Sequence, residues 1–266
     1  MPELPEVEGY RRYIEGTALH QAITAVVVND AKPLQQSEEE FQQALVGQKW
    51  VSTRRIGKYL FLTLDSGSSL LMHFGMTGSP VYYRDPEDEP RFERVSFVLE
   101  NGFRLAFNDP RKFGKLELVP DVAAFQKAKK LADDALEVTE EEFVARLGKK
   151  RKAVKSALLD QDLAAGIGNW IADEMVFLCK LHPETKAHTL TEAQCKALYA
   201  ALHEVCEMAL AYEADYDRFP DKYLTKYRWA EDKEIEGQCP CGKTQLTRIV
   251  VGGRGTYLCP ICQNHG

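Results

Sequence analysis

In the first 130 residues, apolar and polar positions alternate over short runs, which is the pattern of half-buried β-strands. Six such runs predict strands, at residues 23–28, 59–64, 70–74, 95–99, 103–107 and 115–119. The pair Asn101-Gly102 separates the fourth and fifth runs and predicts a tight hairpin turn. Apolar residues also recur at helical spacing between Leu4 and Ile14, so we expect a helix that packs on a β-sandwich or barrel.

The apolar period becomes helical in the second half of the chain. Helices are predicted at residues 143–147, 154–159, 167–179 and 192–212, and a hairpin with four cysteines follows them. This change of period predicts two domains. We expect the first at residues 1–130, a linker at 131–138, helices at 139–235 and the cysteine-bearing hairpin at 236–266.

Composition narrows the classes of protein that fit. With 266 residues, 44% of them hydrophobic and 28% charged, the chain can bury one or two cores, which excludes a disordered protein. Its apolar runs fall short of the roughly 20 residues that cross a bilayer, and the start MPELPEVEGYRR is too acidic for a signal peptide. We therefore expect a protein of the cytoplasm or nucleoid without a membrane partner.

The net charge of −6 argues against a generally basic nucleic-acid coat, so any nucleic-acid site must be local. Basic residues gather in two places, at 149–155 and between residues 222 and 254. Tyr223, Tyr227 and Trp229 lie among the second group. From charge alone, a nucleic-acid-binding face and a solvated surface fit this pattern equally well.

Four cysteines near the end of the chain have the spacing of a metal site. Cys239 and Cys241 form one pair and Cys259 and Cys262 a second, which predicts four thiolates around one Zn²⁺. The one-residue spacer of the first pair leaves open that Cys239 is displaced, or that His265 replaces a ligand. The other cysteines lie in predicted helical segments and are expected in the core: Cys179, Cys195 and Cys206.

Pro2 becomes a secondary amine at the chain start once the initiator Met is removed. An α-amino group has an ordinary pKa of about 7.7–8.0, so a neutral fraction can attack an aldehyde-like carbon and form an iminium ion. Glu3 and Glu6 stand beside it as candidate general acid and base groups. Acidic residues at a helix start also suit the helix dipole without any catalytic role. Small tautomerases that use an N-terminal proline as a base are the competing class, but they are far shorter and have no zinc hairpin.

Two glycines flank Ile167 in the segment AGIGNWIADE, between two predicted helices. The free backbone N–H groups at the start of the second helix could bind a phosphate there, with Asn169 at the same end. A tight helical hairpin without any ligand fits this segment as well.

Six motifs in this order resemble the formamidopyrimidine-DNA glycosylase/endonuclease VIII family. They are PELPEVE at 2–8, RRIGKYL at 54–60, HFGMTG at 73–78, NDPRKFG at 108–114, AGIGNWIADE at 165–174 and RGTYLCPIC at 254–262. The resemblance implies an α+β fold: an N-terminal β-sandwich with a long helix, a helix-two-turn-helix domain and a C-terminal zinc-finger β-hairpin. It also implies a monomeric, bifunctional DNA glycosylase and AP lyase of base-excision repair, with one structural Zn²⁺.

The resemblance assigns roles to particular residues. Pro2 would attack C1′ of the damaged nucleotide in double-stranded DNA, expel the base and cut the strand through a Schiff base by β- and δ-elimination. Glu3 would help to open the sugar ring, and Glu6 would support the catalytic site. Phosphates would be contacted by Lys58, which also counts as catalytic, and by His73, Asn169 and Arg254. The gap left by the everted nucleotide would be filled by Met76, Arg111 and Phe113. Lys155 is expected to contact DNA because of its place in the basic group at 149–155, not because of the resemblance.

Two features bear on the substrate. Met76 and Phe113 lie on two separate loops, which favours the formamidopyrimidine branch of the family over the endonuclease VIII branch. The stretch 211–237 has no glycine until Gly237, unlike the glycine-rich loop that covers 8-oxoguanine in many bacterial members. We therefore expect a preference for formamidopyrimidines and hydantoins. The alternatives are an enzyme for oxidised pyrimidines and a damaged-DNA-binding zinc protein without turnover.

Overall fold

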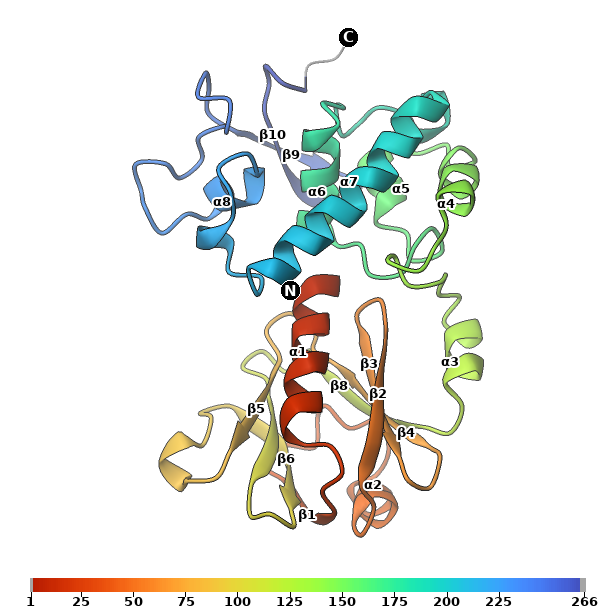
Figure 1. The fold of residues 1–266 in the computed structure, drawn as a ribbon, viewed down its shortest axis with the longest axis vertical. Coiled ribbons are helices and arrows are strands. Elements are labelled where there is room, and N and C mark those ends of the chain that lie inside the picture. Colours follow the sequence, from red (N-terminus) through yellow and green to blue (C-terminus); the bar gives the residue numbers. More distant parts are fainter. Residues whose placement is uncertain (1, 264–266) are drawn as a thin grey trace. The chain divides into compact units, whose positions relative to one another are not determined.

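The structure is a computed structural model and describes residues 2–263 (Figure 1). Its contacts divide the chain into two compact units. The first contains Pro2 and Glu6–Lys129, and the second contains Glu3–Pro5 and the chain from Lys130 onward. Helix α1, Leu4–Thr17, therefore contributes residues to both units. Within residues 2–263, no helix is long and apolar enough to cross a membrane.

The first unit is a β-sandwich of two antiparallel four-stranded sheets, as the sequence predicts. One sheet has the order β1-β6-β7-β5 and the other β2-β3-β4-β8. The strands are β1 (Ile23–Val28), β2 (Trp50–Ile56), β3 (Tyr59–Leu64), β4 (Ser69–His73), β5 (Ser79–Tyr83), β6 (Glu93–Leu99), β7 (Arg104–Asn108) and β8 (Lys115–Val119). Apolar side chains from both sheets and from α1 form one shared core.

All six predicted strands are present, with ends shifted by at most two residues, and Gly102 makes the predicted turn at a φ of 83°. Strands β2 and β5 were not predicted. Two arginines interrupt the apolar pattern of β2, and β5 contains Pro80. β5 lies at the edge of its sheet and has a neighbouring strand on one side alone. A proline, which has no backbone N–H, is tolerated in such an edge strand. Three short helices were also missed: α2 (Glu38–Leu45), α3 (Val122–Ala128) and α8 (Leu224–Arg228).

Glu8 fixes α1 on the β-sandwich. Its carboxylate accepts hydrogen bonds from Arg11 and Arg12 on the same helix and from Arg55 on β2, the last at 3.1 Å. Burial would raise the pKa of Glu8, but these hydrogen bonds lower it to about 2. The helix that follows Pro2 is thus anchored to a strand of the sheet.

The second unit is helical. Four of its helices, α4 (Glu140–Leu147), α5 (Val154–Leu158), α6 (Asn169–Leu178) and α7 (Glu192–Ala211), share a core that surrounds the apolar α6. Leu224 of α8 packs in a separate small cluster with Phe177 of α6, Cys239 and Cys259. Thr139 and Thr191 close the first turns of α4 and α7 with capping boxes, which explains where these helices begin. The four predicted helical segments coincide with α4, α5, α6 and α7.

A β-hairpin ends the described chain. Strands β9 (Thr247–Val251) and β10 (Arg254–Leu258) pair antiparallel, and Gly252 and Gly253 form the turn at φ values of 57° and 78°. Both central residues of this two-residue turn need a positive φ, which glycine adopts without strain. The four clustered cysteines lie before β9 and directly after β10.

Candidate active site

Glu3 occupies the N-terminus of α6. Its Oε1 accepts the backbone N–H of Trp170 at 3.0 Å and its Oε2 that of Ile171 at 3.2 Å. Gly168, the residue that precedes α6, has no side chain that could accept a hydrogen bond from the helix start. Glu3, which is distant in the sequence, supplies the acceptor instead. The positive end of the helix dipole favours a carboxylate at this place. Glu3 is only 2% exposed.

Gly168 is required by the close approach of Glu3. A Cβ atom at position 168 would lie 1.9 Å from the carboxylate carbon of Glu3 and 2.3 Å from each of its oxygens. The backbone at Gly168 is extended, with a φ of −118°, so its conformation alone would allow any residue. Two of the N–H groups that the sequence offers to a phosphate are therefore occupied by Glu3.

Pro2 and Glu6 flank Glu3 along the chain. Pro2 directly precedes Glu3 and is half-buried, and Glu6 lies about one helical turn further along α1, also half-buried. Burial raises the pKa of Tyr10 to about 12, and the negative charge of the nearby Glu6 adds to this effect. Glu6 and Tyr10 thus share one face of α1.

Lys58 and His73 lie together in the first unit, Lys58 in the turn between β2 and β3 and His73 at the end of β4. Burial lowers the pKa of His73 to about 4, and the positive charges of Lys58 and Lys115 lower it further. The imidazole is therefore neutral near pH 7. Its Nδ1 accepts the backbone N–H of Gly75 at 3.3 Å, which leaves Nε2 as the protonated nitrogen that can donate.

Met76 and Phe113 stand on two loops that touch. Gly75, at a φ of 57°, lies so close to the second loop that a Cβ atom there would be 2.4 Å from the carbonyl carbon of Phe113. The side chain of Met76 is 41% exposed and that of Phe113 51%. The guanidinium of Arg111, an exposed residue, lies 5.3 Å from the centre of the Phe113 ring. Three exposed side chains thus lie on two neighbouring loops.

Asp109 and Arg94, which sequence reasoning missed, hold the second loop. The buried Asp109 accepts the backbone N–H groups of Arg111 at 3.2 Å and Gly114 at 2.7 Å. Arg94 donates to the backbone carbonyls of Asp109 at 2.8 Å and Pro110 at 3.4 Å. The motif NDPRKFG contains the signal for Asp109, because an Asp in a turn commonly binds backbone N–H groups that follow it.

Lys155 stands among the basic residues that the sequence assigns to DNA contact, but the structure buries its side chain completely. Its ammonium group lies 2.6 Å from the carboxylate of Asp173 on α6 and donates to Thr256 Oγ1 at 2.7 Å and to the carbonyl of Gly255 at 3.0 Å. A buried lysine needs such partners, because an unpaired charge in the interior is costly. Lys155 thus joins α5 and α6 to β10.

Asn169 meets the same carbonyl group. Its side-chain amide donates to the oxygen of Gly255 at 3.0 Å, so the first residue of α6 is also joined to β10. Arg254, the residue before Gly255, is exposed. Two buried or half-buried donors, from Asn169 and Lys155, therefore fix the backbone beside an exposed guanidinium.

Asp173 joins α6 to Lys155, to α8 and to β10, and the sequence analysis missed it. Besides Lys155, its carboxylate pairs with Arg228 of α8 at 2.9 Å and accepts the backbone N–H of Tyr257 at 3.4 Å. Neither Asp173 nor Lys155 is accessible to solvent. An acidic residue within the apolar run of α6 was the available signal, because a buried carboxylate requires a buried partner.

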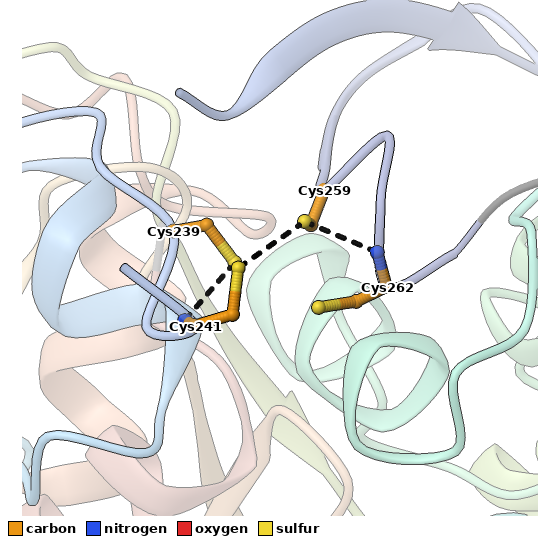
Figure 2. A group of neighbouring side chains, drawn as sticks. All are labelled: Cys239, Cys241, Cys259 and Cys262. Carbon is orange, nitrogen blue, oxygen red and sulfur yellow. Dashed lines mark hydrogen bonds between the residues drawn. The ribbon is translucent and has the colours of Figure 1, made fainter. Parts of the chain in front are cut away.

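The four predicted metal ligands lie together (Figure 2). The Sγ atoms of Cys239, Cys241, Cys259 and Cys262 are all within 4.8 Å of one another, and those of Cys241 and Cys259 are 3.9 Å apart. Tetrahedral zinc with Zn–S bonds of about 2.3 Å would place its sulfur ligands roughly 3.8 Å apart, so this group can hold such an ion. The one-residue spacer does not displace Cys239, which is buried within the cluster. His265 lies outside the described residues.

Comparisons with known proteins identify the family. The family model of the formamidopyrimidine-DNA glycosylase N-terminal domain matches residues 1–116, and that of the formamidopyrimidine-DNA glycosylase H2TH domain matches residues 131–220. A formamidopyrimidine-DNA glycosylase of Arabidopsis thaliana is 34% identical over 281 residues, which cover 99% of this chain and 71% of the relative. One of Desulfitobacterium hafniense is 37% identical over 275 residues, which cover 99% and 100% of the two chains.

Solved structures give the same result. A Lactococcus lactis formamidopyrimidine-DNA glycosylase bound non-covalently to DNA with an AP site superposes with a TM-score of 0.86 and 26% identity, over 99% of this chain and 100% of that one. The L. lactis enzyme in complex with DNA that contains the formamidopyrimidine of deoxyguanosine gives a TM-score of 0.86 and 27% identity at the same coverage. The likeness inferred from the six motifs is thus confirmed, and the chain belongs to the formamidopyrimidine-DNA glycosylase family.

Proposed function

We propose that this chain is a bifunctional DNA glycosylase and AP lyase of base-excision repair, which removes oxidised purines, formamidopyrimidines first, from double-stranded DNA. The observation that carries the proposal is the placement of Glu3: a carboxylate next in the chain to the Pro2 amine, held by two backbone N–H groups at the start of α6. Membership of the family supports the same activity. We expect a monomer that works where its substrate is, in the cytoplasm at the nucleoid.

The first chemical step joins the enzyme to the sugar. The nitrogen of Pro2 forms a bond to C1′ of the damaged nucleotide while the bond from C1′ to the base breaks, and the base leaves with the bonding electrons and takes up a proton. The carboxylate of Glu3 takes up the proton that the Pro2 nitrogen loses and passes it to O4′, so that the C1′–O4′ bond opens and the freed nitrogen lone pair forms an iminium ion. Glu6 supports the site from the next turn of α1.

The iminium ion makes strand cleavage possible because it withdraws electrons from C2′. Loss of a proton from C2′ expels the 3′-phosphate by β-elimination, and a second elimination expels the 5′-phosphate. Water then hydrolyses the remaining iminium and frees the Pro2 amine. Each of these steps moves one proton, which suits an acid/base group held beside the nucleophile.

Phosphate contacts position the nucleotide for this chemistry. We assign them to Lys58, to the neutral His73 through its Nε2–H, to Asn169 and to the exposed guanidinium of Arg254. Lys155 is assigned a supporting role rather than a direct contact, because its ammonium holds the carbonyl of Gly255 beside Arg254.

One structural Zn²⁺ is proposed for the four-cysteine cluster, held by Cys239, Cys241, Cys259 and Cys262. A four-thiolate donor set suits zinc, and a bound ion would supply the stability that a short hairpin lacks. Arg254 begins β10 and Cys259 directly follows that strand. An ion bound by the cysteines would therefore stabilise the strand that carries Arg254.

The everted nucleotide leaves a gap in the duplex, and unstacking it costs a few kcal/mol. We assign Met76, Arg111 and Phe113 to this gap. A flexible thioether, a planar hydrogen-bond donor and an aromatic ring can insert, bind the orphaned base and stack on its neighbour, respectively. The contact of the two loops through Gly75 and the hydrogen bonds of Asp109 hold these groups in place before DNA binds.

Borohydride trapping tests the proposed chemistry. Untagged protein, with removal of Met1 checked by mass, is incubated with duplexes that contain an abasic site, a formamidopyrimidine, 8-oxoguanine or thymine glycol. We expect a covalent adduct, strongest for the abasic site and the formamidopyrimidine, that is lost in Pro2→Gly. Glu3→Gln should suppress base removal, whereas Glu87→Gln, at an exposed position of the first unit, should not. An adduct that persists in Pro2→Gly, or no adduct on any duplex, would contradict the proposal.

A further inference from the structure

Trp229 is a large aromatic side chain that the proposed chemistry leaves unused. Of the three tryptophans in the sequence, Trp50 and Trp170 are buried, whereas Trp229 is 47% exposed. The neighbouring Tyr223 is buried and Tyr227 is half-buried. Trp229 is thus the most exposed residue of this aromatic group.

The indole of Trp229 is held in a fixed orientation. The guanidinium of Arg228 lies 4.2 Å from the centre of the indole and 4.5 Å from the centre of the Tyr257 ring, so it is stacked between the two rings. The side chain of Arg228 is only 5% exposed and pairs with the fully buried Asp173. A cation held in the interior therefore fixes the orientation of the indole, while 47% of Trp229 stays exposed.

Two separate chains of contacts place Trp229 at the same end of α6 as Glu3. The ring of Tyr216 lies 5.8 Å from that of Trp229 and 5.7 Å from that of Trp170, whose backbone N–H donates to Glu3. Along the second chain, Arg228 and Lys155 share the carboxylate of Asp173, one turn into α6. Tyr216 thus links Trp229 to Trp170, the residue whose backbone N–H binds the carboxylate of Glu3.

We propose that the exposed part of the Trp229 indole stacks on the everted base of the damaged nucleotide and that Trp229 is a specificity-determining residue. This inference rests on the proposed function, because it requires a nucleotide at Glu3. A base taken out of the duplex loses its stacking neighbours, and an aromatic side chain restores one of them. Stacking favours a planar, conjugated lesion such as a formamidopyrimidine, gives less to thymine glycol with its saturated, puckered ring, and gives nothing to an abasic site.

Single-turnover cleavage of three duplexes tests this contact. In Trp229→Ala, with enzyme in excess but below saturation, we expect the single-turnover rate to fall about 5- to 150-fold for the formamidopyrimidine duplex, the range for loss of one base–aromatic stack. The loss for thymine glycol should be smaller, and cleavage at a preformed abasic site should stay within twofold of wild type. Trp229→Phe should recover most of the lost activity, since it keeps an aromatic face. Val250→Ala, at a position of the same unit that is 65% exposed, is the matched control and should leave all three rates unchanged.

Fluorescence gives a readout of the contact itself. In the Pro2→Gly background, a formamidopyrimidine duplex should protect Trp229 from acrylamide, whereas an abasic duplex should not. Protection should vanish in Pro2→Gly/Trp229→Phe, because the two remaining tryptophans are buried in the free protein.

The outcomes separate failure of the inference from failure of the proposed function. An equal loss of formamidopyrimidine and abasic cleavage in Trp229→Ala would assign Trp229 a structural role and overturn the inference. Wild-type rates on all duplexes in that variant, or equal acrylamide protection by both duplexes, would also overturn it. Absence of trapping by the wild-type protein on every duplex would instead remove the proposed function.

Discussion

Gly168→Ala perturbs the candidate active site with a single methyl group. The new Cβ would lie 1.9 Å from the carboxylate carbon of Glu3, whereas non-bonded carbon atoms rest about 3.5–4.0 Å apart. The extended backbone at position 168 accepts alanine without strain, so the clash with Glu3 is the whole effect. The carboxylate must retreat by at least roughly 1.5 Å, a distance taken from the same contact range.

This retreat breaks both hydrogen bonds from Trp170 and Ile171, at 3.0 and 3.2 Å. Hydrogen bonds to a charged group contribute about 1.5–3 kcal/mol each, and water recovers a part, so we expect the free energy of unfolding to fall by about 2–4 kcal/mol. A misplacement of about 1 Å can cost about 100-fold in rate, so base excision should slow by that factor or more.

Two assays check these magnitudes. Urea denaturation gives the free energy of unfolding, and single-turnover excision from a formamidopyrimidine duplex gives the rate. Affinity for an undamaged duplex should change less than twofold, because Glu3 is not assigned a phosphate contact. Gly9→Ala is the matched control, since a Cβ there has no neighbour within 4 Å.

A double variant identifies the cause. In the Glu3→Ala background the clash is gone, so Gly168→Ala should cost little further stability. Wild-type excision and stability in the single variant would refute the placement of Glu3 at the start of α6. An equal loss in the presence and absence of the Glu3 side chain would refute it as well.

Three further perturbations test other parts of the molecule. The pKa of His73 is about 4 in the folded chain and 6.5 ordinarily, so the unfolded state binds more protons between these pH values. The free energy of unfolding should therefore fall by at most about 2 kcal/mol from pH 7 to pH 5. Urea titrations of wild type and His73→Gln at several pH values measure this fall. Cys259→Ser should abolish zinc binding, measured by elemental analysis. It should also reduce the salt slope of duplex binding by about one unit, and Arg254→Ala should do the same. Asp173→Asn should destabilise the fold by about 3–5 kcal/mol in urea because it leaves Lys155 buried without its counter-charge, and Lys155→Met in the same chain should recover part of the loss.

Each of these expectations has a contradicting result. If the free energy of unfolding depends on pH in the same way in His73→Gln as in wild type, protonation of His73 does not cause the loss of stability. Metal-free Cys259→Ser protein with an unchanged salt slope would separate the hairpin cysteines from DNA binding. A loss below about 1 kcal/mol in Asp173→Asn would show that the buried pair is not sensitive to its carboxylate.

Patterns between near neighbours in the chain determined much of the fold. The six alternating runs predicted six of the strands, and Asn101-Gly102 predicted their hairpin, because both depend on backbone preferences over a few residues. The same holds for the four helical segments and for the cysteine pairs of the hairpin. Strands β2 and β5 were missed because arginines and a proline hide the alternation there, and only the neighbouring strands of a sheet decide such cases.

The tertiary structure alone decided how the candidate site is assembled. Glu3 and Trp170 are 167 positions apart, so no local pattern shows that Glu3 caps α6 or that Gly168 must lack a side chain. The sequence marked Lys155 as one basic residue among several, whereas the fold buries it against Asp173 and Gly255. A sequence reports the charge and the size of a side chain. Whether that charge meets water, a phosphate or a buried carboxylate depends on which distant segments pack around it, because desolvation must be compensated by partners that only the folded chain brings near.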